Sequence, residues 1–178
     1  VVINPCDYNQ TKAATIAAAK HVGPVYLRFG RPGVPNFTPE DQTFEIGKAL
    51  HLIEGTDVTV FATGHLVWEA IQAAEALEAE GIKAEVINIH TIKPLDEKAV
   101  IESAAKTGAV VVAEEHFVAG GLGELISGVL AANKPAPVEY VAIKDKFGQS
   151  GTPAALMKAY GLDAENIVAA CKKAIARK

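Results

Sequence analysis

The chain of 178 residues is 49% hydrophobic and 21% charged, which is typical of a soluble globular protein with a substantial core. Its formal net charge is −4 and charges of both signs are interspersed, which argues against binding to nucleic acid or to an anionic membrane surface. No apolar run approaches the roughly 18 residues that a membrane-spanning helix needs, so we expect no membrane span.

The first 36 residues have the pattern of a β-α-β unit. Val1–Asn4 predicts a short strand, a helix with Asp7 or Asn9 as its cap follows, and Pro24–Phe29 predicts a second strand. One helix and two strands cannot close a core, because each helix or sheet face must be buried against another layer. We therefore expect residues 1–36 to be the tail of a larger, incomplete domain.

Methionine and cysteine usage adds two expectations. The only methionine is Met157, so residue 1 is not a translation start, and we expect the chain to be a piece of a longer or processed protein. Cys6 and Cys171 lie far apart without metal-binding spacing, which predicts neither a disulfide framework nor a zinc site. This pattern favours an intracellular protein, which we expect in the cytoplasm.

The stretch RPGVPNFTPED, at residues 31–41, contains three prolines, one glycine and no hydrophobic periodicity. Such a composition is typical of a linker. We therefore predict a domain boundary here, with residues 37–47 as the linker and residues 48–178 as a second domain.

The second domain is predicted to alternate strands with helices. Its five strands are expected at Ala49–Ile53, Val58–Ala62, Lys83–Ile89, Ala109–Ala113 and Val138–Ile143. Its helices are expected at Leu66–Glu80, Pro94–Gly108, from near Gly123 to Ala132, Pro153–Tyr160 and Asp163–Ala176. The tight turn at residues 54–57 predicts that the first two strands form an antiparallel hairpin. The predicted fold class is α/β, with three α/β/α layers around a five-stranded, mostly parallel sheet that has one antiparallel edge strand.

The predicted strand Ala109–Ala113 is apolar on both faces, so we expect it in the middle of the sheet. Glu114, Glu115 and His116 follow it and are expected in a turn at the carboxyl edge, where α/β folds place ligands and contacts. They are compatible with a charge relay, a partner contact or a solvated strand end. We favour the last two interpretations.

The segment GGLGE, at residues 120–124, places glycines at the start of a predicted helix. Free N–H groups at a helix start can bind phosphate. However, the spacing of Gly120, Gly121 and Gly123 departs from the GxGxxG fingerprint of dinucleotide-binding proteins. We favour the alternative that these glycines allow close packing and a tight turn.

No nucleophile-base set is visible, because the sequence lacks GxSxG, HExxH and a phosphate loop ending in Gly-Lys-Ser/Thr. The five histidines are isolated, and a structural role is the simpler interpretation of each. His65 and His116 are both expected at the carboxyl edge of the sheet, so they are the pair most worth examining.

Arg28 and Arg31 lie at the exit of the strand predicted at Pro24–Phe29. A guanidinium group matches the oxygens of a phosphate, so a phosphorylated substrate is one interpretation of these arginines. Pairing with acids across a domain interface is the other, and the spacing does not decide between them.

Five blocks, in this order, resemble the carboxyl-terminal part of transketolase over nearly the whole chain. They are VYLRFGRP, DVTVFATG, EVINIHTIKPLDEKAV, VVVAEEHFVAGGLGE and KDKFGQSGTPAALMKAYGL. The resemblance implies transfer of a two-carbon ketol unit between sugar phosphates, with thiamine diphosphate and Mg²⁺ or another divalent metal in the whole enzyme. It also implies an amino-terminal transketolase section as partner, in a homodimer or heterotetramer.

The resemblance assigns the substrate phosphate to Arg31, and Arg28 matches a less constant neighbour. It places no cofactor or metal ligand on this chain, so the fragment alone should be inactive and its second domain structural and dimer-supporting. Deoxyxylulose-phosphate synthase and the beta subunit of 2-oxo-acid decarboxylases are alternatives within the same scaffold. A free-standing α/β regulatory or interaction domain is the alternative from another class.

Overall fold

A five-stranded sheet organises most of the molecule. The computed structural model describes residues 1–178, and the strand order of this sheet is β3-β5-β4-β7-β8. The strands are β3 (Leu50–Ile53), β4 (Val58–Ala62), β5 (Ala84–Asn88), β7 (Val110–Phe117) and β8 (Val138–Ile143). Only β3 is antiparallel to its neighbour, and the other pairs are parallel. The predicted mostly parallel sheet with one antiparallel edge strand is therefore confirmed.

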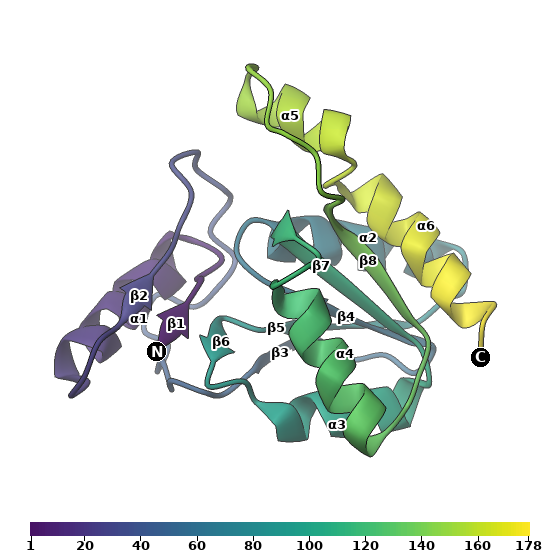
Figure 1. The fold of residues 1–178 in the computed structure, drawn as a ribbon, viewed down its shortest axis with the longest axis horizontal. Coiled ribbons are helices and arrows are strands. Elements are labelled where there is room, and N and C mark those ends of the chain that lie inside the picture. The colour runs from purple at the N-terminus through teal and green to yellow at the C-terminus, as the bar shows by residue number, and fades with distance from the viewer.

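Helices cover both faces of this sheet (Figure 1). They are α2 (Leu66–Ala79) and α6 (Ala164–Ile175) on one face, and α3 (Glu97–Thr107) and α4 (Leu122–Asn133) on the other. A further helix, α5 (Pro153–Tyr160), lies beyond the carboxyl ends of β7 and β8. None of the helices combines the length and the apolar character that crossing a membrane requires.

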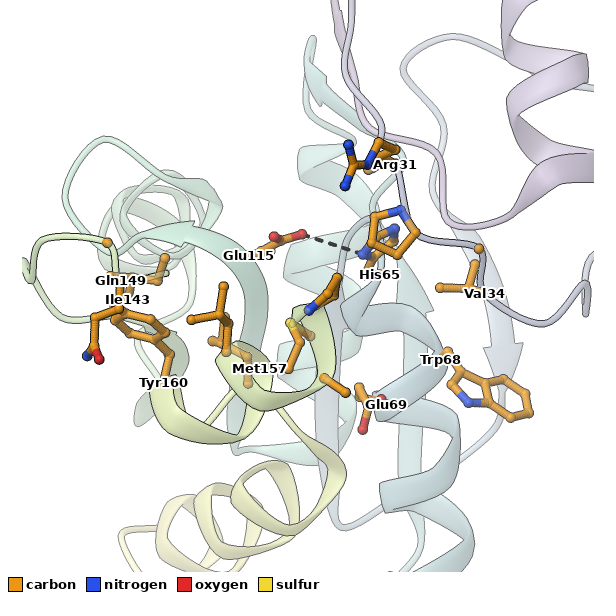
Figure 2. Close-up of a pocket in the computed structure, with 18 of the residues that line it drawn as sticks. Arg31, Val34, His65, Trp68, Glu69, Glu115, Ile143, Gln149, Met157 and Tyr160 are labelled. Atoms are coloured by element: carbon orange, nitrogen blue, oxygen red, sulfur yellow. Dashed lines mark ion pairs between the residues drawn. The ribbon is translucent and has the colours of Figure 1, made fainter. Parts of the chain in front are cut away.

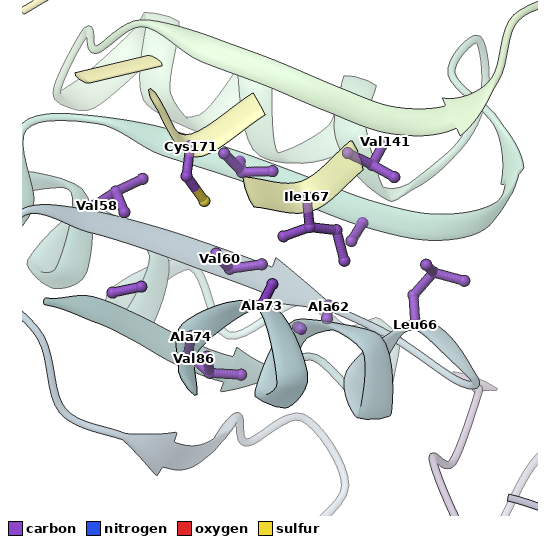
Figure 3. Packing of buried hydrophobic residues seen from close by; sticks show 14 of the residues in the cluster. Val58, Val60, Ala62, Leu66, Ala73, Ala74, Val86, Val141, Ile167 and Cys171 are labelled. Atoms are coloured by element: carbon purple, nitrogen blue, oxygen red, sulfur yellow. The ribbon is translucent and has the colours of Figure 1, made fainter. Parts of the chain in front are cut away.

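Two hydrophobic cores lie between these layers, because successive residues of a strand face opposite sides of the sheet. Val60 packs in the core beneath α2 and α6, whereas Phe61 packs in the core beneath α3 and α4. Figure 3 shows the first core, where Ile167 and Cys171 of α6 face Val60 across the layer. Burial raises the pKa of the Cys171 thiol to about 12, so this cysteine serves as a small core residue.

The predicted hairpin between the first two strands is wrong. β5 lies between β3 and β4, and the turn at residues 54–57 crosses the beginning of β5. The backbone N–H groups of Thr56 and Asp57 both donate to the carbonyl of Lys83, at 3.1 and 2.9 Å. Every residue of β5 is buried, so β5 takes an interior position, whereas the half-exposed β3 becomes the edge.

Two expectations about β7 also need correction. The middle strand is β4, and β7 lies between β4 and β8. β7 continues to Phe117, so Glu114, Glu115 and His116 belong to the strand rather than to a turn. The pairing with β8 shifts register between Ala113 and Phe117, and this irregularity lets β7 extend past the point where its apolar run ends.

A second, three-stranded sheet was not predicted. It has the order β2-β1-β6, from β1 (Val2–Ile3), β2 (Tyr26–Leu27) and β6 (Thr91–Lys93), and α1 (Tyr8–Lys20) connects β1 to β2. β1 is parallel to β2 and antiparallel to β6, so backbone pairing joins the amino-terminal segment to the rest of the chain. The domain boundary at residues 37–47 stays a prediction. The pairing of β1 with β6 joins residues on the two sides of that boundary.

Asp7 ties the amino-terminal segment to the proline-rich stretch. Its buried carboxylate caps α1 by accepting from the Gln10 N–H at 2.8 Å. The same carboxylate accepts from the backbone N–H groups of Phe37 and Thr38, at 3.0 and 2.8 Å, and from the Thr38 hydroxyl at 2.7 Å. Phe37 in turn stacks on Trp68 of α2, with ring centroids 5.7 Å apart. The segment predicted as a linker is therefore held down at these residues.

His90, between β5 and β6, should make the stability of the protein depend on pH. Burial lowers the pKa of its imidazole from 6.5 to about 4, although Asp96 opposes the shift. The unfolded chain therefore binds the extra proton first, so the free energy of unfolding should decrease as pH falls from about 6.5 towards 4. Between pH 7.5 and 5 we expect a loss of about 2 kcal/mol from this group.

Urea unfolding at pH 7.5 and pH 5 measures this effect. The variant His90→Asn should lose about 2 kcal/mol less than the wild type between these pH values. His21→Asn, which changes an exposed histidine, should behave as the wild type. Equal losses in the wild type and His90→Asn would show that this imidazole does not contribute.

Candidate functional site

A cavity of about 520 Å³, which we call the main cavity because Arg31, His65 and Glu115 line it, lies where the two parts of the chain meet α5. Arg31 comes from the loop after β2, His65 immediately precedes α2, and Glu115 lies near the end of β7 (Figure 2). Met157 and Tyr160 of α5 close another side. Because β4 and β7 both end here, the cavity lies at the carboxyl edge of the sheet, as expected for an α/β fold.

The walls of the cavity combine apolar side chains with charged residues of both signs. Trp68, Ile143 and Met157 are among its apolar residues, while Arg31 and Lys146 bring positive charges. The two acidic residues of the lining have partners within the chain, since Glu69 accepts from the Ala164 N–H at 2.9 Å and Glu115 lies 3.6 Å from Nδ1 of His65. Such a cavity suits a small organic anion, whose carbon skeleton contacts the apolar wall and whose charged group meets a guanidinium or ammonium.

The alternation of side chains along β7 divides the predicted acidic and histidine residues between two sites. Glu115 and Phe117 line the main cavity. Glu114 and His116 line a smaller cavity of about 200 Å³ on the other side, together with Arg28. His65 and His116, expected at the same edge, therefore do not share a cavity.

Glu114 is neither a solvated strand end nor free to accept a ligand. Its buried carboxylate accepts hydrogen bonds from the N–H groups of Leu122 and Gly123, both at 2.8 Å, at the start of α4. Burial raises the pKa of Glu114, against the effect of these two donors. The position that a phosphate would take at this helix start is thus occupied by the protein's own carboxylate.

The glycines of the GGLGE segment make this arrangement possible. A Cβ atom on Gly121 would lie 2.2 Å from the carbonyl oxygen of Phe117 and 2.6 Å from both carboxylate oxygens of Glu114. A Cβ atom on Gly123 would lie 2.6 Å from the ring of Tyr140. The close-packing interpretation of these glycines is therefore confirmed.

The structure separates the two candidate arginines. Arg28 donates from Nη2 to the backbone carbonyl of Glu115, at 2.8 Å, and so bridges β2 to β7. Arg31 makes no hydrogen bond or ion pair within the chain and lines the main cavity. Its guanidinium is therefore available to a ligand, whereas that of Arg28 is engaged in a structural contact.

Several cavity residues were missed at the level of sequence. Lys146, Trp68 and Tyr160 lie on three different elements and match no catalytic or binding motif. The nearest signal is the glycine-broken loop KDKFGQSG at residues 144–151, which precedes α5 at the rim of the cavity. Only folding brings these side chains together.

One group of residues has ligand atoms near enough to one another for a metal ion. His51, Glu54 and Glu85 have ligand atoms within 4.8 Å of one another. However, the ammonium of Lys106 already contacts both carboxylates and therefore supplies the positive charge there. Glu85 raises the pKa of Lys106, which keeps this ammonium protonated. These three residues therefore do not fit a divalent metal.

Fold and cavity together define a class of protein: a three-layer α/β domain with a partly apolar cavity, lined by charged residues that include Arg31, at the carboxyl edge of its sheet. The sequence profile described as "Transketolase, C-terminal domain" matches residues 47–167. The chain therefore belongs to the transketolase C-terminal domain family.

Named relatives agree with this family. The chain is 46% identical, over 99% of its length and 55% of that protein, to the 6-deoxy-6-sulfo-D-fructose transketolase subunit of Clostridium sp. strain MSTE9. It is 36% identical, over 94% of its length and 26% of that protein, to 1-deoxy-D-xylulose-5-phosphate synthase of Heliobacterium modesticaldum. A solved split-gene transketolase, described as an inactive β4 tetramer, superimposes with a TM-score of 0.97 at 48% identity. That comparison covers 99% of this chain and 58% of the solved chain. The chain thus spans a little over half of its transketolase relatives.

Proposed function

We propose that this chain is the carboxyl-terminal part of a split transketolase that transfers a two-carbon ketol unit between sugar phosphates. In this proposal residues 1–36 complete a pyrimidine-binding domain, residues 37–47 link it to the second domain, and residues 48–178 support the assembly. The amino-terminal transketolase section is the partner, in a homodimer or heterotetramer. The subunit names of the 46% identical relative and the split-gene neighbour support this arrangement.

The observation that carries the proposal is the free guanidinium of Arg31 in the cavity at the carboxyl edge. A guanidinium without an internal partner offers a planar set of N–H donors, which matches the oxygens of a phosphate. The partly apolar wall opposite Arg31 suits the carbon chain of a sugar. Arg31 is therefore the residue that we assign to the substrate phosphate.

Thiamine diphosphate and Mg²⁺ belong to the proposed whole enzyme, where the cofactor would act as the electron sink of ketol transfer. This chain offers no free group of metal ligands, since Lys106 occupies its one suitable cluster. We therefore assign cofactor and metal binding to parts of the enzyme outside residues 1–178, and we expect the chain alone to be inactive.

A reconstitution assay tests the proposal. A polypeptide that contains this chain together with the rest of the pyrimidine-binding domain is mixed with the candidate amino-terminal section, thiamine diphosphate, Mg²⁺, a ketose phosphate donor and an aldose phosphate acceptor. Ketol transfer should appear only when both parts are present. Formation of 1-deoxy-D-xylulose 5-phosphate instead would favour the function of the 36% identical relative. If neither product forms, a regulatory or interaction role replaces the proposed one.

Arg31→Ala in the reconstituted enzyme should raise KM for the phosphorylated donor by about 10- to 100-fold, because hydrogen bonds to charged groups contribute roughly 1.5–3 kcal/mol. The KM of Arg31→Lys should fall between those of the wild type and Arg31→Ala, because lysine keeps the positive charge but lacks the forked N–H donors of a guanidinium. Arg177→Ala is the control, because Arg177 pairs with Glu139 away from the cavity. An unchanged KM in Arg31→Ala would remove this residue from the phosphate site.

A further inference from the structure

The loop that presents Arg31 is shaped by a residue of the second domain. A Cβ atom on Gly30 would lie 2.2 Å from Cε1 and 2.5 Å from Nε2 of His65. The imidazole of His65 therefore occupies the space that a side chain at position 30 would need, directly before Arg31. The imidazole therefore packs closely against the backbone that leads to the guanidinium.

The side chain of His65 packs against Gly30 and does not cap its own helix, α2. It stands at the N-cap position of α2 but makes no side-chain capping hydrogen bond. Serine, threonine, aspartate or asparagine would stabilise the helix start better at such a position. His65 therefore stabilises the start of α2 less than a capping residue would. Its ring packs instead against the loop that carries Gly30.

Glu115 holds both the histidine and the beginning of the loop. Its Oε2 lies 3.6 Å from Nδ1 of His65, the pair drawn as a dashed line in Figure 2. Its backbone carbonyl accepts the hydrogen bond from Arg28. One residue at the end of β7 therefore contacts the loop at Arg28 directly and at Gly30 through the imidazole.

We propose that His65 and Glu115 are positioning residues, which act through Gly30 to hold the guanidinium of Arg31 where it meets the substrate phosphate. The proposal rests on the proposed function and gives the second domain a specific part in it. In this proposal His65 and Glu115 act on the loop before Arg31 and not on the phosphate or the reacting carbons. Their removal should therefore impair recognition of the phosphate group more than the transfer step.

The test compares a ketose phosphate with the same ketose lacking phosphate, in the reconstituted enzyme. His65→Ala should raise KM for the phosphorylated donor about tenfold, with kcat changed less than twofold. The kcat/KM for the unphosphorylated donor should stay within twofold of the wild type. Glu115→Gln should change the same constants in the same direction, by a smaller factor. His51→Ala is the matched control, because His51 also lies beside a glutamate, Glu85, and is remote from the cavity lining.

A double-variant cycle distinguishes positioning from a general loss of structure. Gly30→Ala alone should behave as His65→Ala, because the new Cβ displaces the ring. In the His65→Ala background the same change should have no further effect, since the ring is gone. Additive effects, equal losses with both donors, or an unchanged KM would each overturn the proposal. A wild-type enzyme without any ketol transfer would instead overturn the proposed function itself.

Discussion

Gly55→Ala should destabilise the protein by about 3 kcal/mol, one of the largest effects that we expect from a single methyl group. A Cβ atom at this position would lie 2.2 Å from the nitrogen of Glu85, 2.3 Å from the carbonyl carbon of Ala84 and 2.6 Å from the carbonyl oxygen of Lys83. All three atoms belong to backbone, so no side chain can rotate away to make room.

Relief requires that the turn at residues 54–57 move away from β5. That movement would lengthen the two hydrogen bonds from Thr56 and Asp57 to the Lys83 carbonyl. It would also disturb the pairing of β5, which holds β3 at the edge of the sheet. The expected cost therefore combines overpacking with the loss of backbone hydrogen bonds.

Urea unfolding followed by circular dichroism measures this cost. Gly128→Ala is the matched control, because a Cβ atom there meets nothing within 4 Å and the position lies inside α4. The helix propensity of alanine should make this control more stable by up to about 1 kcal/mol. Similar midpoints for Gly55→Ala and the wild type would contradict the close crossing of the turn over β5.

Asp7→Ala should destabilise the protein by about 4 kcal/mol. The substitution removes the cap of α1, which contributes roughly 1 kcal/mol. It also leaves the buried N–H of Thr38 without its acceptor, at a cost of roughly 1–3 kcal/mol, and the half-buried N–H of Phe37 at a smaller cost. The loss is large because one carboxylate serves two segments that lie about 30 residues apart in the sequence.

The single tryptophan gives this prediction a local readout. Trp68 stacks on Phe37, so the release of residues 37 and 38 should change its fluorescence before circular dichroism detects unfolding. Asp7→Asn should lose about half as much stability, because it keeps one of the two acceptor oxygens. Asp41→Ala, which removes an exposed acid from the same region, should stay within about 0.5 kcal/mol of the wild type. A Trp68 signal that is the same in Asp7→Ala and the wild type would contradict the anchoring role.

Most elements of the larger part of the chain were predictable from local patterns. Apolar runs marked the five strands, and the stripe of Val67, Ala70 and Leu77 marked α2. Asp96 and Gly108 cap α3 as expected, with Gly108 in the left-handed conformation at φ 71°. These signals act within a few residues, so the sequence displays them directly.

The sequence by itself determined the α/β class, the mostly parallel sheet and the membership of the transketolase C-terminal domain family, because periodicity, caps and ordered motifs are local properties. Only the tertiary structure decided that β5 separates β3 from β4, and that β6 joins the amino-terminal segment. It also gave Arg28 and Arg31 different environments. The guanidinium of Arg28 donates to the Glu115 carbonyl, whereas the guanidinium of Arg31 lines an open cavity. The physical reason is that each of these outcomes depends on atoms brought together from distant segments, and no local pattern records such contacts.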